Sequence, residues 1–177
     1  MPGAQPPPFR ADGRTLAGTD LVLAPVAADD AVVLGQATAA MEPWRRYGFG
    51  AAALETLFRP ASDGGERLAL RSARGEVAAA IVIRPAWLAG PYVQFLVVLP
   101  AFQGRGLGSG LLAWVDAEAR RASARNLWIC TSAFNDGAAR LYRRHGFEDV
   151  AILHDLVRDG IGERLMRKRL LASPSGS

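Results

Sequence analysis

The sequence predicts a single α/β domain in which helices flank a mixed, mostly antiparallel β-sheet. Three observations support this fold class. The 177 residues, half of them apolar, can bury one sizeable core and are too few for two ordinary catalytic domains. The middle of the chain shows a hairpin pattern, typical of antiparallel pairing, and the stretch after it shows the strand, helix, strand order that is typical of parallel pairing.

The N-terminal part of the chain predicts one strand and two helices. Residues 20–25 form the expected strand, and Asp29 or Asp30 can cap a helix that runs to about residue 41. A second helix is expected over residues 50–58, before a loop that contains proline and two glycines.

The next two strands are expected to form a hairpin. Residues 66–72 and 76–84 flank Ala73-Arg74-Gly75, where glycine can take the backbone angles of a tight turn. The strand that follows, residues 92–99, is almost continuously apolar, which is typical of a strand covered on both faces.

The C-terminal half alternates helices and strands. Apolar residues recur at helical spacing over 107–119, and residues 126–133 form another apolar strand, so the strands on either side of this helix are expected to be parallel. A short helix over 136–145 and strands over 150–156 and 163–170 complete the predicted sheet.

The two ends of the chain are expected to be flexible tails, residues 1–18 and 172–177, around a single domain of residues 19–171. The first residues are proline-rich and lack the charged start and apolar helix of a secretory signal. The chain has one cysteine, Cys130, so it is expected to form no disulfide and no cysteine-rich metal site. We therefore expect a cytoplasmic protein without a metal.

The formal net charge of +4 does not by itself indicate a nucleic-acid partner, because the arginines are scattered and no basic stripe with interleaved aromatic residues is present. We expect no nucleic-acid binding, and a basic nucleic-acid-binding domain is kept as an alternative. No stretch reaches the roughly 20 apolar residues that a membrane-spanning helix needs, so no membrane partner is expected.

A glycine-rich turn, Gln103-Gly-Arg-Gly-Leu-Gly-Ser-Gly110, lies between a buried strand and the start of a helix. Glycines let backbone N–H groups approach a ligand closely, and the unpaired N–H groups of a helix start carry partial positive charge, so the turn fits a diphosphate. Two rival motifs are absent: a dinucleotide fingerprint would need glycine at Ser109 or Leu111, and a triphosphate-binding loop would need lysine after the last glycine.

The pattern Gln103-x-x-Gly106-x-Gly108, which follows an apolar strand, resembles the coenzyme A signature of the GNAT N-acetyltransferase superfamily. Residues 139–147, which end in Tyr-Arg-Arg-His-Gly-Phe, are similar to the family's helix that ends in Tyr and then Gly-Phe. The resemblance implies a GNAT-like sheet of about six to seven strands whose parallel pair is splayed. It also implies that acetyl-coenzyme A binds in the split.

Carried over residue by residue, the resemblance implies several cofactor contacts. The main chain of Leu96, Val97 and Val98 would line the pantetheine arm, with one N–H polarising the thioester carbonyl. Asn135 would contact the amide arm or cap its helix, and Tyr142 would protonate the departing thiolate as the catalytic acid or pack as an ordinary amphipathic ring. The turn would supply the remaining cofactor-binding residues, Gln103, Gly104, Arg105, Gly106, Leu107, Gly108 and Ser109.

The sequence leaves open which base deprotonates the acceptor amine. Many members of the resembled family place an acidic residue on the strand before the turn, where this chain has Gln94 and Phe95. Glu42, His154 and Asp155 are candidates, and each has a structural alternative as a cap, a solvent-facing group or a loop anchor.

Acceptor selectivity is expected from the N-terminal helices and the loops, with contacts from Glu42, Trp44, Tyr47 and Asp155. The implied reaction is direct transfer of the acetyl group to a primary amine of a small molecule or a protein in a ternary complex. The alternative is an acyl-coenzyme A sensor of the same fold that catalyses no transfer. Similar proteins commonly dimerise, so the resemblance allows a homodimer.

Overall fold

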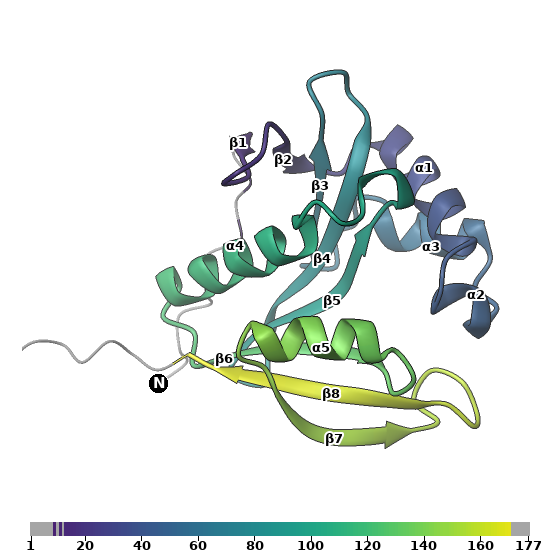
Figure 1. Ribbon diagram of the computed structural model, residues 1–177, viewed down its shortest axis with the longest axis vertical. Coiled ribbons are helices and arrows are strands. Elements are labelled where there is room, and N and C mark those ends of the chain that lie inside the picture. The colour runs from purple at the N-terminus through teal and green to yellow at the C-terminus, as the bar shows by residue number, and fades with distance from the viewer. Residues whose placement is uncertain (1–8, 10, 12, 171–177) are drawn as a thin grey trace, which may run out of the picture.

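The computed structural model describes Phe9, Ala11 and residues 13–170. In these residues one eight-stranded sheet has the strand order β1-β2-β3-β4-β5-β6-β8-β7, with helices on both faces (Figure 1). In chain order the elements are β1 (Arg14–Thr15), β2 (Val22–Pro25), α1 (Ala28–Ala39), α2 (Trp44–Tyr47), α3 (Ala51–Phe58), β3 (Glu66–Arg71), β4 (Val77–Trp87), β5 (Gly90–Val98), the 3-10 helix η1 (Pro100–Phe102), α4 (Leu107–Arg121), β6 (Asn126–Ser132), α5 (Asp136–Arg144), β7 (Glu148–His154) and β8 (Gly162–Arg169).

The core consists of two apolar layers, one on each face of the sheet. Successive side chains of a strand point to opposite faces, so Ile81 of β4 packs on the α4 side whereas Val82 packs on the α1 and α3 side. Leu111 of α4 and Phe58 of α3 are completely buried in these two layers. Helices α4 and α5 therefore cover one face, and α1 to α3 cover the other (Figure 1).

The predicted hairpin and the predicted parallel pair are both confirmed. Strands β3 and β4 pair antiparallel around Gly75, whose φ of 83° is the left-handed conformation that the turn requires. Strands β5 and β6 are parallel, and their pairing is limited to Tyr92 with Trp128 and Val93 with Ile129.

The parallel pair closes tightly at one end and opens at the other. At the start of β5, a Cβ added to Gly90 would lie 1.9 Å from the carbonyl oxygen of Asn126, so only glycine fits this close approach. Beyond Val93, residues 96–98 pair with β4 and not with β6. The splayed pair implied by the sequence resemblance is thus present, and the gap between β5 and β6 positions the site described below.

The structure differs from the sequence expectations at the N-terminus. Residues 1–8, 10, 12 and all of the tail predicted at 172–177 lie outside the described residues. The described part of the tail predicted at 1–18 is structured, because Arg14–Thr15 pairs with β2 and Phe9 is only 2% exposed. Phe9 packs edge-on against Trp114 of α4, with 6.1 Å between the ring centroids, and this burial outweighs the proline-rich composition.

Asp30, one of the two residues expected to cap the first helix, does cap it, but from the first turn and not at the N-cap position. The N-cap is Ala27, and the carboxylate of Asp30 accepts a hydrogen bond from the Ala27 N–H at 2.8 Å from three residues into the helix. Asp30 also pairs with Arg71 of β3, so one acidic side chain stabilises the helix start and ties it to the sheet. Among the described residues, no helix has the length and apolar character needed to cross a membrane.

Candidate active site

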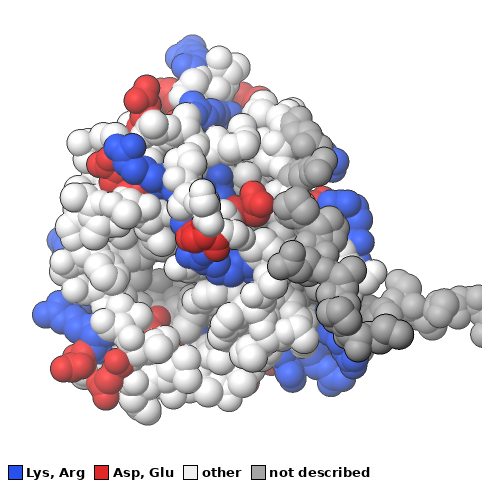
Figure 2. All heavy atoms as spheres, turned by 180° about the vertical axis from the view of Figure 1, so that it is seen from behind, with Lys and Arg blue, Asp and Glu red and all other residues white. Residues whose placement is uncertain are grey.

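A cavity of about 560 Å³ opens where β5 and β6 part. Figure 2 shows a hollow on the side turned away in Figure 1, bordered mostly by uncharged residues. The cavity brings together ten of the residues that the sequence predicted for the site: Glu42, Trp44, Tyr47, Leu96, Val97, Val98, Gln103, Gly108, Asn135 and Tyr142. The other six predicted residues do not line it: Gly104, Arg105, Gly106, Leu107 and Ser109 of the turn, and Asp155.

The turn residues outside the cavity form the N-terminus of α4. Gly106 is the N-cap with a φ of 76°, and no side chain caps the helix. The first helical hydrogen bond joins the Gly110 N–H to the Gly106 carbonyl at 2.9 Å, so the N–H groups of residues 107–109 have no acceptor within the helix. These donors and the positive end of the α4 dipole form an anion-binding site of the kind that holds a diphosphate.

Two polar side chains stabilise this turn. Gln103 donates its amide N–H to the Val98 carbonyl at 3.0 Å, and Arg105 donates to the Ala101 carbonyl at 3.1 Å. Both side chains thus contact the chain itself, where they fix the path from β5 to α4.

The main chain of β5 offers only part of the predicted contacts. The Leu99 N–H donates to the carbonyl of Ala78, the second residue of β4, so strand alternation turns the main-chain groups of Val97 toward β4 as well. The same alternation turns those of Leu96 and Val98 into the gap. The expectation that Val97 offers a main-chain contact is therefore wrong, because its N–H and C=O face the sheet.

Tyr142 of α5 is 6% exposed, lines the cavity and lies beside Phe147, with 6.1 Å between the ring centroids. Burial raises the pKa of the Tyr142 phenol above its usual value, so the hydroxyl stays protonated at neutral pH. No hydrogen bond joins this hydroxyl to another of the described residues. It can therefore donate its proton to a group bound in the cavity.

Asn135 caps α5, since its side-chain oxygen accepts from the Ala138 N–H at 3.1 Å. Of the two interpretations of Asn135 from the sequence, the helix cap is thus present, and the residue also lines the cavity.

Aromatic side chains form the wall of the cavity on the side of α2. The ring of Trp44 stacks on Phe95 at a centroid distance of 4.6 Å and an interplanar angle of 20°. Phe58 meets the same Phe95 ring edge-on at 5.0 Å. Such a wall suits the apolar part of a ligand.

The three base candidates from the sequence have different surroundings. Glu42 lines the cavity and pairs with Arg45 at 2.9 Å, with both side chains well exposed. Asp155 accepts from the Gly160 N–H at 2.6 Å and so holds the β7–β8 loop. This is the role of loop anchor that the sequence left open as the alternative to that of a base. His154, the last residue of β7, does not line the cavity.

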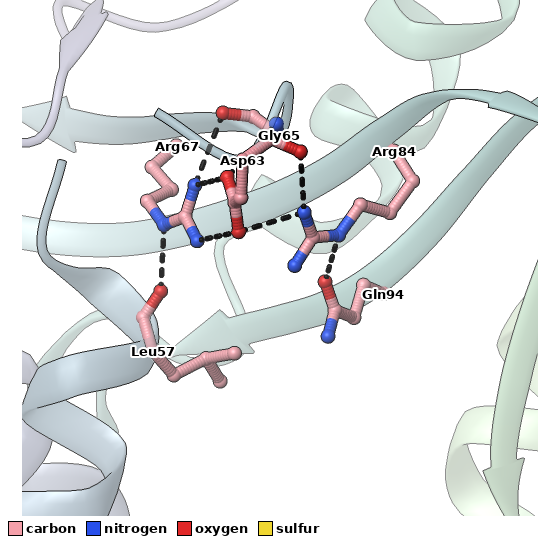
Figure 3. A network of polar contacts seen from close by, with 6 residues as sticks. All are labelled: Leu57, Asp63, Gly65, Arg67, Arg84 and Gln94. Carbon is pink, nitrogen blue, oxygen red and sulfur yellow. Dashed lines mark hydrogen bonds and ion pairs between the residues drawn. The ribbon is translucent and has the colours of Figure 1, made fainter. Parts of the chain in front are cut away.

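Gln94, which stands where many members of the resembled family carry an acid, is fixed by a polar network (Figure 3). Its side-chain oxygen accepts from Arg84 Nε at 2.7 Å, and Arg84 in turn pairs with Asp63 at 2.7 Å. Arg67, 8% exposed, donates one N–H to each oxygen of the Asp63 carboxylate, at 2.9 and 2.8 Å, and shares Oδ2 with Arg84. The hydrogen bond from Arg67 keeps the pKa of Asp63 well below its usual range.

The sequence did not single out Glu163, the second residue of β8, as a site residue. Glu163 is 6% exposed and lines the cavity, and its carboxylate accepts from the Tyr47 hydroxyl. The Tyr47 hydroxyl also lies 2.7 Å from the Ser132 hydroxyl. Tyr47 and Glu163 are 116 residues apart, so no local pattern could have shown this contact.

Cys130 of β6 also lines the cavity. Burial raises the pKa of its thiol to about 12, so almost none of it is thiolate at neutral pH. Among the described residues, no group of three or more His, Cys, Asp or Glu side chains could hold a metal ion.

The chain is 43% identical to aminoalkylphosphonate N-acetyltransferase of Salmonella typhimurium over 56 residues, which make up 32% of this chain and 36% of that protein. The match thus spans about a third of that relative's length.

Two solved structures show the same fold. Ard1 from Thermoplasma volcanium has a TM-score of 0.69 at 19% identity, covering 86% of this chain and 99% of that one. Spermidine N-acetyltransferase from Vibrio cholerae, solved in complex with CoA and spermine, has a TM-score of 0.64 at 14% identity, covering 85% and 95%.

The family model of the Acetyltransferase (GNAT) family matches residues 36–147, which is more than half of the chain. The matched segment contains the splayed strand pair, the glycine turn and the helix with Tyr142. The chain therefore belongs to the GNAT acetyltransferase family.

Proposed function

We propose that this protein is an acetyl-coenzyme A-dependent N-acetyltransferase that passes the acetyl group directly to a primary amine of a small molecule or a peptide. One observation carries the proposal: the gap between β5 and β6 joins an anion-binding helix start to a cavity that contains a buried phenol. Members of this family bind acetyl-coenzyme A, whose diphosphate and thioester are separated by an extended arm. The helix start, which suits the diphosphate, and the gap, which suits the arm and the thioester, support this proposal.

Each part of the site has a proposed role in binding the acyl donor. The N–H groups of residues 107–109 bind the diphosphate. The main-chain groups of Leu96 and the N–H of Val98 face the gap and bind the pantetheine arm, while the Val98 carbonyl accepts from Gln103. One of these N–H groups polarises the thioester carbonyl as negative charge develops on its oxygen.

Tyr142 is the proposed acid. Its phenol is protonated, buried and free of hydrogen bonds to other described residues, so it can give its proton to the sulfur as the carbon–sulfur bond breaks. Direct transfer is favoured over a covalent acyl-enzyme, because the cysteine in the cavity is a thiol with a pKa of about 12.

The names of similar proteins support an aliphatic primary amine as the acceptor. An aminoalkylphosphonate and a polyamine are named for two of them, and both compounds carry such a group. The aromatic wall of Trp44 and Phe95 would contact the carbon chain beside the amine.

A second candidate function is an acyl-coenzyme A sensor that catalyses no transfer. The observation that favours it is Gln94, an uncharged residue that is held by Arg84 on the strand where many family members carry an acid. A sensor would bind the cofactor in the same gap and release no thiol.

Turnover of acetyl-coenzyme A with a panel of primary amines separates the two functions. The panel includes propylamine, spermidine, an aminoalkylphosphonate, alaninamide and a short peptide, with free thiol measured by a chromogenic reagent and the acetylated product by mass. Release of thiol together with acetylated amine supports the transferase. Tight coenzyme A binding with no acetylated product from any amine supports the sensor.

A further inference from the structure

We propose that the carboxylate of Glu163 binds the acceptor ammonium and takes its proton, with Tyr47 and Ser132 holding the carboxylate in place. The proposal rests on the proposed N-acetyltransferase function and names the base that the sequence left open.

The strand register brings the three side chains together. Glu163 of β8 stands directly opposite Ser132 of β6, so the two side chains project from the same face of the sheet. Tyr47 of α2 reaches them from the other side of the gap. All three line the cavity, as Leu96, Val98 and Tyr142 also do.

The hydrogen bonds define which atoms are available. A carboxylate can only accept, so the single Tyr47 proton is donated to Glu163 Oε1 and the Ser132 hydroxyl donates to the Tyr47 oxygen. The second carboxylate oxygen, Oε2, then remains for a ligand.

Charge is the strongest argument for an ammonium ligand. Glu163 is 6% exposed, and none of its contacts among the described residues is an ion pair. Of the described residues that line the cavity, none is Lys, Arg or His, and Glu42 at the exposed rim is the one other acid. Burying a carboxylate without a counter-ion costs free energy, so a cation that enters the cavity is attracted to Glu163 with no other positive charge competing for it.

The environment also suits proton transfer. Burial raises the pKa of Glu163 above its usual value of 4.5, which makes the carboxylate a stronger base. Apart from Glu42 at the exposed rim, the other titratable side chains that line the cavity are Tyr47, Tyr92, Cys130 and Tyr142, and burial raises the pKa of each of these four. These four stay uncharged near neutrality, so none of them supplies a positive charge that could pair with the Glu163 carboxylate.

The proton balance of the transfer is complete. Glu163 Oε2 takes one proton from the ammonium, and the freed lone pair of the nitrogen forms the bond to the acetyl carbon. The carbon–sulfur bond breaks, and Tyr142 gives its proton to the sulfur. A second proton from the nitrogen returns to the Tyr142 oxygen through water, and Glu163 releases its proton to solvent.

Glu163→Gln tests the proposal, since glutamine keeps an oxygen for the Tyr47 hydrogen bond but cannot take a proton. Glu148→Gln is the matched control, because Glu148 is an exposed acid on the neighbouring strand β7. The readouts are the pH profile of kcat/KM, the Kd of coenzyme A and the Tm, measured with each amine of the panel that the wild type acetylates.

The expected loss depends on the pKa of the amine. A variant without a base uses only the neutral amine, which at pH 7 is roughly 1 in 2,500 for an alkylamine of pKa 10.4 and roughly 1 in 7 for an α-amine of pKa near 7.8. We expect Glu163→Gln to lose about 100-fold or more with propylamine and about 10-fold or less with alaninamide. With propylamine its rate should rise about tenfold per pH unit from neutrality to about pH 9, because the neutral fraction of the amine rises in that way, whereas the wild type and Glu148→Gln level off.

Each outcome decides between the assignments. Unchanged coenzyme A affinity, a Tm no lower than wild type and the steep pH profile support Glu163 as the base. Two results would overturn the assignment of Glu163 while the wild type still acetylates amines. One is a pH profile of kcat/KM for Glu163→Gln like that of the wild type. The other is an equal loss of kcat/KM with every amine together with a lowered Tm. Coenzyme A binding by the wild type without acetylation of any amine ends the proposed function and this assignment together.

Discussion

Replacing Asp63 by alanine is expected to destabilise the protein by removing the centre of the network that holds Gln94. Arg67, Arg84 and Gln94 are joined through this carboxylate (Figure 3). In the Asp63→Ala variant, the Arg67 guanidinium keeps two carbonyl acceptors, those of Leu57 and Gly65, but loses its counter-ion.

The size of the loss follows from the burial of the two partners. The Arg67 side chain is 6% exposed and the Asp63 side chain 37% exposed. Breaking a fully buried pair costs about 3–5 kcal/mol, and because water reaches the Asp63 side of this pair, we expect about 2–3 kcal/mol here. For a chain of this size the Tm should fall by about 4–12 °C.

Thermal unfolding followed by circular dichroism measures this loss, and Asp20→Ala, at an exposed position between β1 and β2, is the control. The KM of the acceptor amine should also rise, since Arg84 would no longer be fixed against Gln94. A Tm within 1 °C of the wild type for Asp63→Ala would refute the reasoning, because it would mean that the buried Arg67 needs no counter-ion.

Three further predictions concern the site and the pH dependence of stability. Tyr142→Phe should lower kcat by about 10²–10⁴ while the Kd of coenzyme A, from calorimetry, changes less than threefold; a change in Kd alone would contradict its role as the acid. Gly106→Val should lower the Tm, because valine is strained at a positive φ, and should raise the Kd of coenzyme A at least tenfold while the chemical step stays intact. The control Gly75→Val has a similarly positive φ (83° against 76°) and equally open surroundings, so it should show a similar loss in Tm but bind coenzyme A normally. Equal binding by both variants would contradict the proposed diphosphate site. Arg67 lowers the folded-state pKa of Asp63 below its unfolded value of about 3.9, so the stability from this pair is complete above that value and is lost as the pH falls below it. Urea unfolding between pH 7 and pH 3 should therefore show the unfolding free energies of the wild type and Asp63→Ala converging at the acid end. A constant difference would contradict this linkage.

Local patterns in the sequence were enough to predict most of the fold. The hairpin at Gly75 and the two apolar strands around α4 depend on turn chemistry and periodicity, which are properties of short stretches. The anchoring of Phe9 against Trp114 was missed, because composition alone does not show which side chain of a proline-rich segment finds a pocket on a distant helix.

The candidate site divides in the same way. The glycine turn and Tyr142 lie in contiguous motifs, so a resemblance could locate them. Glu163 was missed because its importance depends on the register of β8 against β6 and on Tyr47, which is more than a hundred residues away. An acid at the start of a strand is usually solvated, and the sequence contains no sign that this one is enclosed.

The strand register also corrected the prediction that Val97 offers a main-chain contact to the cofactor. Leu96, Val97 and Val98 are equivalent as apolar residues, and only the hydrogen bond from Leu99 to Ala78 shows which of them turn their main chain into the gap. Asp155 was misplaced for a related reason, since the loop it closes directs it to Gly160 and away from the cavity.

A crystal structure of the protein with coenzyme A tests the central claim most directly. The diphosphate is expected within hydrogen-bond distance of the N–H groups of residues 107–109, the pantetheine arm between β5 and β6, and the sulfur beside the Tyr142 hydroxyl. Coenzyme A bound on another surface, with the strand gap closed by side chains, would contradict the account.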